Sequence, residues 1–262
     1  MRIRIVILVM ISLMFAQSEQ PYPPLELVSI PTAGTLPKGS YTYETILTKN
    51  GGVTPKLAVG LTDNLTFGFA YGIHNLIGDQ KPDYNPQPGF IVKYRAYSET
   101  TKWPAIVLGL NTQGKGVWQE TVKDTIQIDR YEQKALGFYI TASKNWNMMG
   151  NLGVHIGLSK NTWEDLDADD DINFFIGIDK ELNRSFSLLL ECDAALNDNE
   201  YEFDDLTFGR GKGYVNAALR WAVVPNVLVE INFNDIRKNS TIESKEVEYT
   251  NREIKIMYSE SF

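Results

Sequence analysis

Two histidines, His74 and His155, are the side chains of this sequence most able to take part in acid–base chemistry near neutral pH. A serine hydrolase needs a serine within hydrogen-bond reach of such a histidine, and a polar partner that orients the ring. Neither histidine has a serine beside it on the apolar side of its own segment. We therefore predict no catalytic residue and no cofactor, and we do not expect an enzyme.

An acidic run offers a second kind of chemistry, because Asp165, Asp167 and Asp169 alternate as the ligands of a calcium loop do. The run lacks the glycine expected at its sixth position, and Ile176 stands where a bidentate glutamate is needed. A second acidic stretch covers residues 200–205. Divalent ions could bridge these stretches to each other or to lipopolysaccharide phosphates, or both could be solvated acidic loops. The three aspartates stay candidates, but no metal site is predicted.

Composition narrows the class of protein. The 262 residues carry a formal net charge of −8, which argues against nucleic acid as a partner. Cys192 is the only cysteine, so no disulfide can form within the chain. No apolar run after residue 16 approaches the roughly 18 residues of a membrane helix.

The first residues predict export. Arg2 and Arg4 precede an apolar stretch from Ile5 to Phe15, and small residues follow at Ala16 and Ser18. This is the pattern of a secretory signal peptide over residues 1–18. Residues 19–38 are rich in proline, and we expect them to form an extended lead-in in the periplasm or at the mouth of a barrel.

From Gly39 onward, alternating polar and apolar residues predict strands and no convincing helix. Most of the segments have the nine to twelve residues of a tilted membrane strand, which is longer than strands of soluble proteins. Twelve segments are predicted, near residues 39–48, 53–61, 65–74, 89–99, 104–112, 133–144, 149–160, 171–180, 184–194, 212–222, 226–235 and 247–259.

The connections between these segments alternate in length. Short ones, such as residues 62–64 and 181–183, alternate with long ones at 75–88, 113–132, 161–170, 195–211 and 236–246; the first connection, 49–52, is also brief. Outer-membrane barrels have short periplasmic turns and long outer loops. With twelve strands and a periplasmic N-terminus, the short turns that alternate with the long connections all fall on the periplasmic side.

Alternation also separates two faces in each segment. In residues 65–74, large apolar side chains such as Phe67 and Phe69 share one face, and small or polar ones such as Gly68 share the other. A lipid-facing wall around a narrow lumen requires this division. The same phase predicts twelve charged lumen-lining residues: Glu44, Lys56, Lys93, Arg95, Glu99, Asp179, Glu191, Asp193, Arg220, Glu230, Glu253 and Lys255.

These lumen charges have mixed sign, and two interpretations follow. They could form an ion-pair network that fills the lumen. Alternatively, they could line a pore and set its selectivity. A ring of one sign would have favoured the pore, and the mixture does not.

Aromatic residues near the segment ends, among them Trp103, Trp146 and Trp221, are typical of interfacial girdles. Phe262 ends the chain on an alternating last segment, which resembles the signal by which outer-membrane barrels are recognised for assembly. We therefore expect outer-membrane lipid, lipopolysaccharide and the barrel-assembly machinery as partners.

Several motifs resemble those of uncharacterised bacterial outer-membrane barrels, loosely similar to the YjbH-type proteins linked with exopolysaccharide export. They are Pro31-Thr-Ala-Gly-Thr-Leu-Pro-Lys-Gly39, Gly60-Leu-Thr-Asp-Asn64, Pro88-Gly-Phe-Ile-Val-Lys-Tyr94 and Asp179-Lys-Glu-Leu-Asn183. The resemblance covers most of the mature chain. It implies a barrel and brings no catalytic residues with it.

The sequence thus predicts an all-β, up-and-down antiparallel barrel of about twelve strands over residues 39–262 in the bacterial outer membrane. Its function is expected to be that of a narrow pore of unknown solute. The alternative is a non-conducting structural or accessory barrel, as in exopolysaccharide export.

This prediction is tested by cell fractionation. We expect the protein in the outer-membrane fraction, because the apolar face of every strand needs lipid. Recovery as a soluble periplasmic protein would contradict the predicted barrel.

Overall fold

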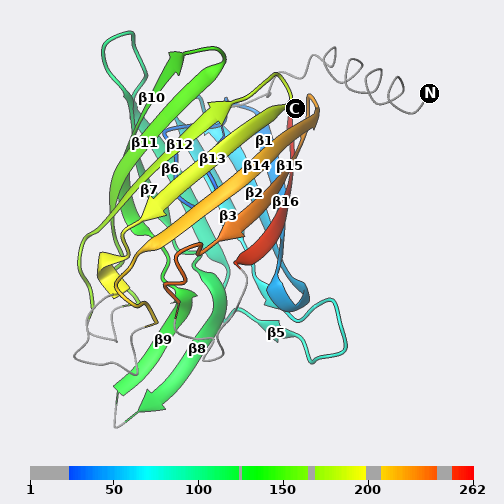
Figure 1. Cartoon of the computed structure of the whole chain (residues 1–262), viewed down its shortest axis with the longest axis vertical. Helices are drawn as coiled ribbons and strands as arrows, with labels where there is room; N and C mark the ends of the chain where they lie inside the picture. The colour runs from blue at the N-terminus through cyan, green and yellow to red at the C-terminus, as the bar shows by residue number, and fades with distance from the viewer. Residues whose placement is uncertain (1–23, 124–125, 165–168, 199–207, 241–249) are drawn as a thin grey trace.

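The computed structural model describes residues 24–123, 126–164, 169–198, 208–240 and 250–262, so the predicted signal peptide lies outside the described residues. Antiparallel strands surround a lumen in chain order, and β1 closes the barrel by pairing with both β2 and β16 (Figure 1). The predicted all-β up-and-down barrel is confirmed. The wall contains twelve strands: β1 (Ser40–Thr48), β2 (Gly52–Thr62), β3 (Leu65–Ala70), β6 (Gly89–Tyr97), β7 (Ala105–Asn111), β10 (Gly137–Asn147), β11 (Asn151–Lys160), β12 (Asn173–Glu181), β13 (Phe186–Asp193), β14 (Tyr214–Val224), β15 (Val227–Asn234) and β16 (Asn251–Ser261).

The period-2 pattern of the sequence sets the two faces of this wall. In β11, Gly153, His155 and Gly157 point inward and are buried, whereas Ile156 and Leu158 are exposed on the outside. In the other strands of the wall, large apolar side chains are likewise exposed outside, and polar side chains are buried inside together with an apolar group that includes Val107, Phe175 and Leu189. A soluble barrel has the opposite arrangement, since its apolar residues fill the interior.

The two ends of the barrel differ. Short connections such as residues 148–150 and 225–226 lie at the end where the chain terminates, and we call this the short-turn end. Long connections, including residues 71–88 and 112–136, lie at the opposite end, which we call the loop end (Figure 1). In the described residues, no helix is long and apolar enough to cross a membrane, and the helical segments there are the 3-10 turns η1 (Lys49–Gly51) and η2 (Leu196–Asp198).

The third predicted segment, residues 65–74, is shorter in the structure. β3 ends at Ala70, whose partner in β2 is Lys56. Because the strands are antiparallel, the next position of the ladder is Pro55 in β2 opposite Tyr71. Pro55 accepts a hydrogen bond from the Tyr71 amide at 3.1 Å but has no N–H to donate. The β2–β3 ladder therefore stops, and two short strands follow: β4 (Ile73–His74) beside β2, and β5 (Asp83–Tyr84) beside β4.

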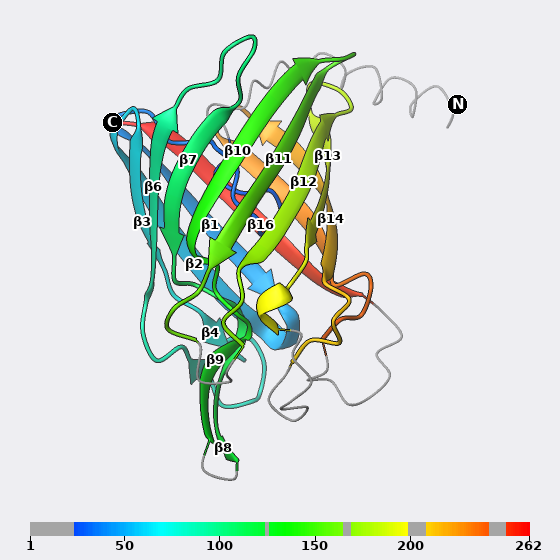
Figure 2. The same ribbon diagram turned by 90° about the vertical axis from the view of Figure 1, so that its left-hand side faces the viewer.

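The connection expected over residues 113–132 is a second difference. It contains a two-stranded hairpin, β8 (Lys115–Lys123) and β9 (Ile126–Gln133), which projects from the loop end (Figure 2). Trp118 packs edge-on against Tyr131 across the hairpin, with ring centroids 4.9 Å apart. At its base, Arg130 forms a buried ion pair of 2.8 Å with Asp198 of η2. These contacts hold a hairpin that is marginal by itself.

Glu164, in the connection between β11 and β12, fastens the base of this hairpin to the barrel. Its buried carboxyl group accepts hydrogen bonds from the amides of Tyr131 at 3.3 Å and Ala135 at 3.2 Å. Burial raises the pKa of Glu164 from 4.5 to about 7. The folded protein thus holds this proton at pH values where the unfolded chain has released it.

This raised pKa predicts a pH-dependent contact. Because the native state binds the extra proton between pH 4.5 and about 7, its stability here falls as pH rises through that window. Amide hydrogen exchange of residues 131–135, corrected for intrinsic rates, should be faster at pH 8 than at pH 5. In Glu164→Gln the difference should vanish, because glutamine does not titrate. An unchanged pH dependence in this variant would exclude Glu164 as the cause.

Candidate functional site

The lumen is occupied by the chain itself. Residues 24–36, which we call the N-terminal hairpin, form a β-bridge between Glu26 and Pro31 and a tight turn in which the Leu27 amide donates to the Ile30 carbonyl at 2.9 Å. The dark-blue trace of this hairpin runs inside the wall in Figures 1 and 2. The sequence predicts an extended lead-in over residues 19–38, in the periplasm or at the mouth of a barrel; in the structure, residues 24–36 of that segment lie inside the barrel.

The apolar residues of the hairpin explain this location. Leu25, Leu27, Val28 and Ile30 stand between two prolines, and in the periplasm they would be exposed to water. Inside the barrel all four are buried. Leu27, Val28, Ile30 and Ala33 pack in one cluster with six inward side chains of the wall, namely Ala105, Val107, Tyr139, Phe175, Leu189 and Ala218.

The tip of the hairpin is bound by one carboxylate. Glu191 of β13 accepts hydrogen bonds from three successive backbone amides, those of Val28 at 3.0 Å, Ser29 at 3.0 Å and Ile30 at 3.1 Å. Asn216 of β14 donates to the same carboxylate at 2.7 Å. Consecutive amides that converge in this way form an anion-binding concavity, and Glu191 supplies the anion.

Basic side chains of the wall bind the carbonyls of the hairpin. Lys93 donates to the carbonyl oxygen of Thr32 at 2.9 Å and also to that of Leu25. Lys255 donates to Val28 at 3.0 Å and to Leu27 at 3.2 Å. Arg220 donates to the Glu26 and Leu27 carbonyls, at 3.2 Å each. Lys56 forms an ion pair of 2.8 Å with the Glu26 carboxylate.

Wall charges also pair with one another. Glu230 of β15 forms ion pairs with its two neighbours in register, Arg220 at 2.7 Å and Lys255 at 3.1 Å. Of the twelve predicted lumen-lining residues, four are partly exposed: Lys56, Arg95, Glu99 and Asp179. The other eight are buried: Glu44, Lys93, Glu191, Asp193, Arg220, Glu230, Glu253 and Lys255. The structure therefore brings wall charges together with each other and with the hairpin, a partner that the sequence analysis missed.

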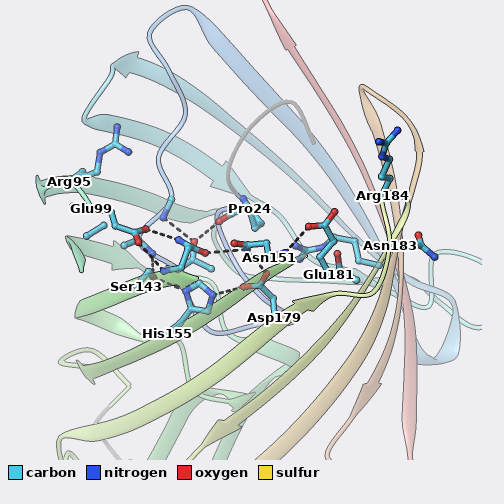
Figure 3. A pocket seen from close by; sticks show the side chains of 17 residues that line it. Pro24, Arg95, Glu99, Ser143, Asn151, His155, Asp179, Glu181, Asn183 and Arg184 are labelled. Atoms are coloured by element: carbon cyan, nitrogen blue, oxygen red, sulfur yellow. Dashed lines mark hydrogen bonds and ion pairs between the residues drawn. The ribbon is translucent and has the colours of Figure 1, made fainter. Parts of the chain in front are cut away.

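A cavity of about 570 Å³ opens between the hairpin and the short-turn end, and we call it the vestibule (Figure 3). Arg95, Glu99 and Asp179, three of the predicted lumen residues, line it. Glu99 accepts hydrogen bonds from Lys144 at 2.9 Å and from the Asn145 side chain at 2.7 Å. The hairpin forms the inner boundary of the vestibule through Pro24 and residues 32–34.

A hydrogen-bonded chain joins the hairpin to this vestibule (Figure 3). The Ala33 amide donates to Ser143 Oγ at 2.7 Å, Ser143 Oγ lies 2.7 Å from His155 Nδ1, and His155 Nε2 lies 2.8 Å from Asp179 Oδ1. A neutral ring that donates from Nε2 to Asp179 leaves Nδ1 to accept the serine proton. The chain thus contains a serine–histidine–acid connection that comparison of residues within one segment could not detect.

This chain anchors the hairpin. In serine hydrolases the nucleophile contacts Nε2 and the acid contacts Nδ1, whereas here the two ring nitrogens have exchanged roles. Ser143 Oγ also accepts the hairpin amide. His74, the other histidine, lies outside this arrangement in the β3–β6 connection, with its Nε2 3.3 Å from Asn85 Oδ1.

Of the three metal candidates, the structure describes one, Asp169. Asp165 and Asp167 lie outside the described residues. Asp169 is buried, and its backbone carbonyl accepts a hydrogen bond from Lys134 at 2.6 Å. Across the part of the chain that the structure describes, no group of three or more histidine, cysteine, aspartate or glutamate residues is arranged to hold a metal ion.

The wall defines the class of protein. Apolar side chains such as Phe69, Leu108 and Ile156 cover the outer surface of a closed sheet, and charged residues are buried inside. Exposed Trp103 and Trp146 lie near the short-turn end, where interfacial aromatic residues belong. The protein is therefore a transmembrane β-barrel of the bacterial outer membrane.

No protein-family model and no curated protein matches the sequence. Among solved structures, the chain is similar to the KdgM porin with 11% identity and a TM-score of 0.45, over 85% of this chain and 99% of that one. It is similar to the NanC porin with 10% identity and a TM-score of 0.44, over 85% and 99% of the two chains. It is also similar to the outer-membrane channel DcaP of Acinetobacter baumannii, with 9% identity, a TM-score of 0.31, and 85% and 95% coverage.

The contact between Glu191 and the hairpin tip can be tested. Glu191→Ala removes the acceptor of three successive hairpin amides, which should destabilise the bound hairpin by about 2–5 kcal/mol. Amide exchange at residues 28–30, followed by mass spectrometry, should accelerate accordingly. Asp193→Ala is the matched control, because Asp193 lies two residues along the same buried face and bonds Asn173 instead. Equal acceleration in both variants would show a general loosening of the wall.

Proposed function

We propose that this protein is a narrow outer-membrane channel that the N-terminal hairpin holds closed. The observation that carries the proposal is the binding of the hairpin across the middle of the lumen. Its contacts come from opposite sides of the wall, with Lys93 of β6 on one side and Glu191 of β13 on the other. The proposal includes no catalytic activity.

Burial of the wall charges supports closure at this depth. A water-filled pore leaves its lining side chains accessible to solvent. Here Lys93 and Lys255 are each 1% exposed, and Arg220 is 2% exposed. Solutes from the short-turn end therefore reach the vestibule and meet the hairpin.

The topology of the hairpin supports reversible closure. Both of its ends lie toward the short-turn end: Pro24 lines the vestibule, and the Leu36 amide donates to Thr66 near the start of β3 at 2.8 Å. The hairpin can leave the lumen in that direction without threading through the wall. Its polar contacts with the wall are hydrogen bonds and ion pairs, which can re-form.

The alternative function is a permanently filled, non-conducting barrel with an accessory role, such as the exopolysaccharide export of YjbH-type proteins. The apolar cluster favours this alternative, because Leu27 and Ile30 pack against wall residues that an open pore would expose. The two functions differ in whether release of the hairpin creates a conducting path.

Single-channel recording in planar bilayers separates them. In full-length Leu27→Asn/Ile30→Asn, each substitution removes an apolar contact of about 1.5–3 kcal/mol, so the hairpin should leave the lumen more often. We expect open events to become at least about tenfold more frequent than in the unmodified protein, since each 1.4 kcal/mol changes an equilibrium tenfold.

A reversible cross-link provides the control. The Ala33 amide and Ser143 Oγ are 2.7 Å apart, so Ala33→Cys/Ser143→Cys in a Cys192→Ala background can tether the hairpin to β10. With these substitutions added to the Leu27→Asn/Ile30→Asn variant, oxidation of the two cysteines should abolish its open events, and a reductant should restore them. Silence of the opened variant at all voltages would refute the channel and favour the accessory barrel.

A further inference from the structure

The lumen that the hairpin fills has two unlike sides at the depth of the hairpin. One side is formed by inward residues of β7, β10, β12, β13 and β14 and is apolar apart from polar residues such as Glu191, which binds the hairpin tip. We call it the apolar side, and its members are Val107, Tyr139, Phe175, Leu189 and Ala218. These strands are contiguous around the wall except for β11, whose inward residue at this depth is Gly157 next to the Phe175 ring.

The other side is charged. It runs across β14, β15, β16, β1 and β2, and continues at β6 beyond β3. The strand register pairs Arg220 with Glu230, Glu230 with Lys255, and Glu44 with Lys56, so acids and bases alternate along it. We call this the charged side; its members are Arg220, Glu230, Lys255, Glu44, Lys56 and Lys93.

The hairpin matches both sides. Leu27 and Ile30 face the apolar side, where glycine at position 177 leaves room for them: a Cβ there would lie 2.4 Å from Leu27 Cδ1 and 2.7 Å from Ile30 Cδ1. To the basic residues of the charged side the hairpin presents acceptors, namely its carbonyl oxygens and the Glu26 carboxylate. Lysine and arginine can only donate, so they require such acceptors.

When the hairpin leaves the lumen, the basic residues lack acceptors and the apolar side lacks a packing partner. The basic residues lose carbonyl and carboxylate oxygens, Glu191 loses its three amide donors, and the apolar residues are exposed to water. A polyhydroxylated solute would supply acceptors to the charged side but would not pack on the apolar side. A hydrocarbon would pack on the apolar side but would supply no acceptors. A molecule that replaces the hairpin needs acceptor oxygens along one edge and an apolar face on the other.

We propose that the opened lumen selects amphipathic carboxylates, molecules with a hydrocarbon face and an anionic, oxygen-bearing end. The proposal rests on the channel function proposed above and names the chemical class of its solute. In it, the carboxylate takes the place of Glu26 beside Lys56 and of the carbonyls at Lys255. The hydrocarbon part contacts Phe175 and Leu189, as Leu27 and Ile30 do.

Current block in the opened full-length variant, Leu27→Asn/Ile30→Asn, tests this proposal. The probes are octanoate and gluconate, which carry the same single charge but differ in that gluconate bears hydroxyl groups where octanoate has methylenes. Octanoate should block the potassium chloride current at a concentration at least about tenfold below that of gluconate, since burial of a few methylenes accounts for such a ratio.

Two further substitutions in the opened variant assign the preference to the two sides. Leu189→Ser should raise the half-blocking concentration of octanoate at least about fivefold and leave that of gluconate unchanged, because only octanoate uses the apolar side. Lys255→Gln should weaken block by both probes. The Leu189→Ser variant also controls for any action of octanoate on the lipid.

The outcomes separate the two proposals. A folded opened variant that carries no current overturns the channel function and this inference with it. A variant that conducts but is blocked equally by octanoate and gluconate, or in which Leu189→Ser changes neither, overturns this inference alone. Should the double variant fail to fold, Glu191→Ala replaces it, because this substitution releases the hairpin tip and leaves the named residues of both sides intact. The Glu191→Ala variant must likewise conduct and must be blocked by octanoate at a lower concentration than by gluconate.

Discussion

Four basic side chains inside the barrel, the partly exposed Lys56 and the buried Lys93, Arg220 and Lys255, need acceptor oxygens, and the rest of the lumen is organised around this need. A cation removed from water without partners is very unfavourable. The backbone carbonyls of the wall already serve the β-ladder, and Glu230 alone cannot satisfy every donor. The hairpin supplies the remaining acceptors, mostly as backbone carbonyls.

The same contacts explain why a proline-rich segment can be an internal element of the fold. Its backbone is extended around a tight turn, so many of its amides and carbonyls are free for the wall. Glu191 takes three of the amides, and Lys255 takes two carbonyls. Apolar packing on Phe175 and Leu189 then adds a contribution that does not depend on charge.

Much of the wall could be predicted from the sequence, because its signals are local. Alternation within ten residues determines which face a side chain occupies, and polar turns mark the strand ends. The hairpin could not be predicted in this way, since Val28 and Glu191 are 163 residues apart. Its apolar residues between Pro24 and Pro31 were the available signal, because they need burial that a periplasmic lead-in does not provide.

The contact between Ser143 and His155 could not be predicted for a related reason. The search for a serine was confined to the segment of each histidine, whereas Ser143 lies in β10 and is directly paired with His155 of β11. A similar limit applied to residues 113–132, where polar composition concealed the alternation of a projecting hairpin.

The closure of the barrel at β1 has a consequence for biogenesis. The N-terminal hairpin directly precedes β1, and β1 gains its second neighbour only when β16, which lies about 200 residues further along the chain, has been made. The Phe262 amide then bonds the Gly39 carbonyl at 2.7 Å, beside the point where the hairpin leaves the lumen. Lys255, which binds the hairpin, reaches it only with this final strand. A continuous wall therefore encloses the hairpin only when β1 and β16 pair, and part of the free energy that stabilises the hairpin in the lumen is gained in that step.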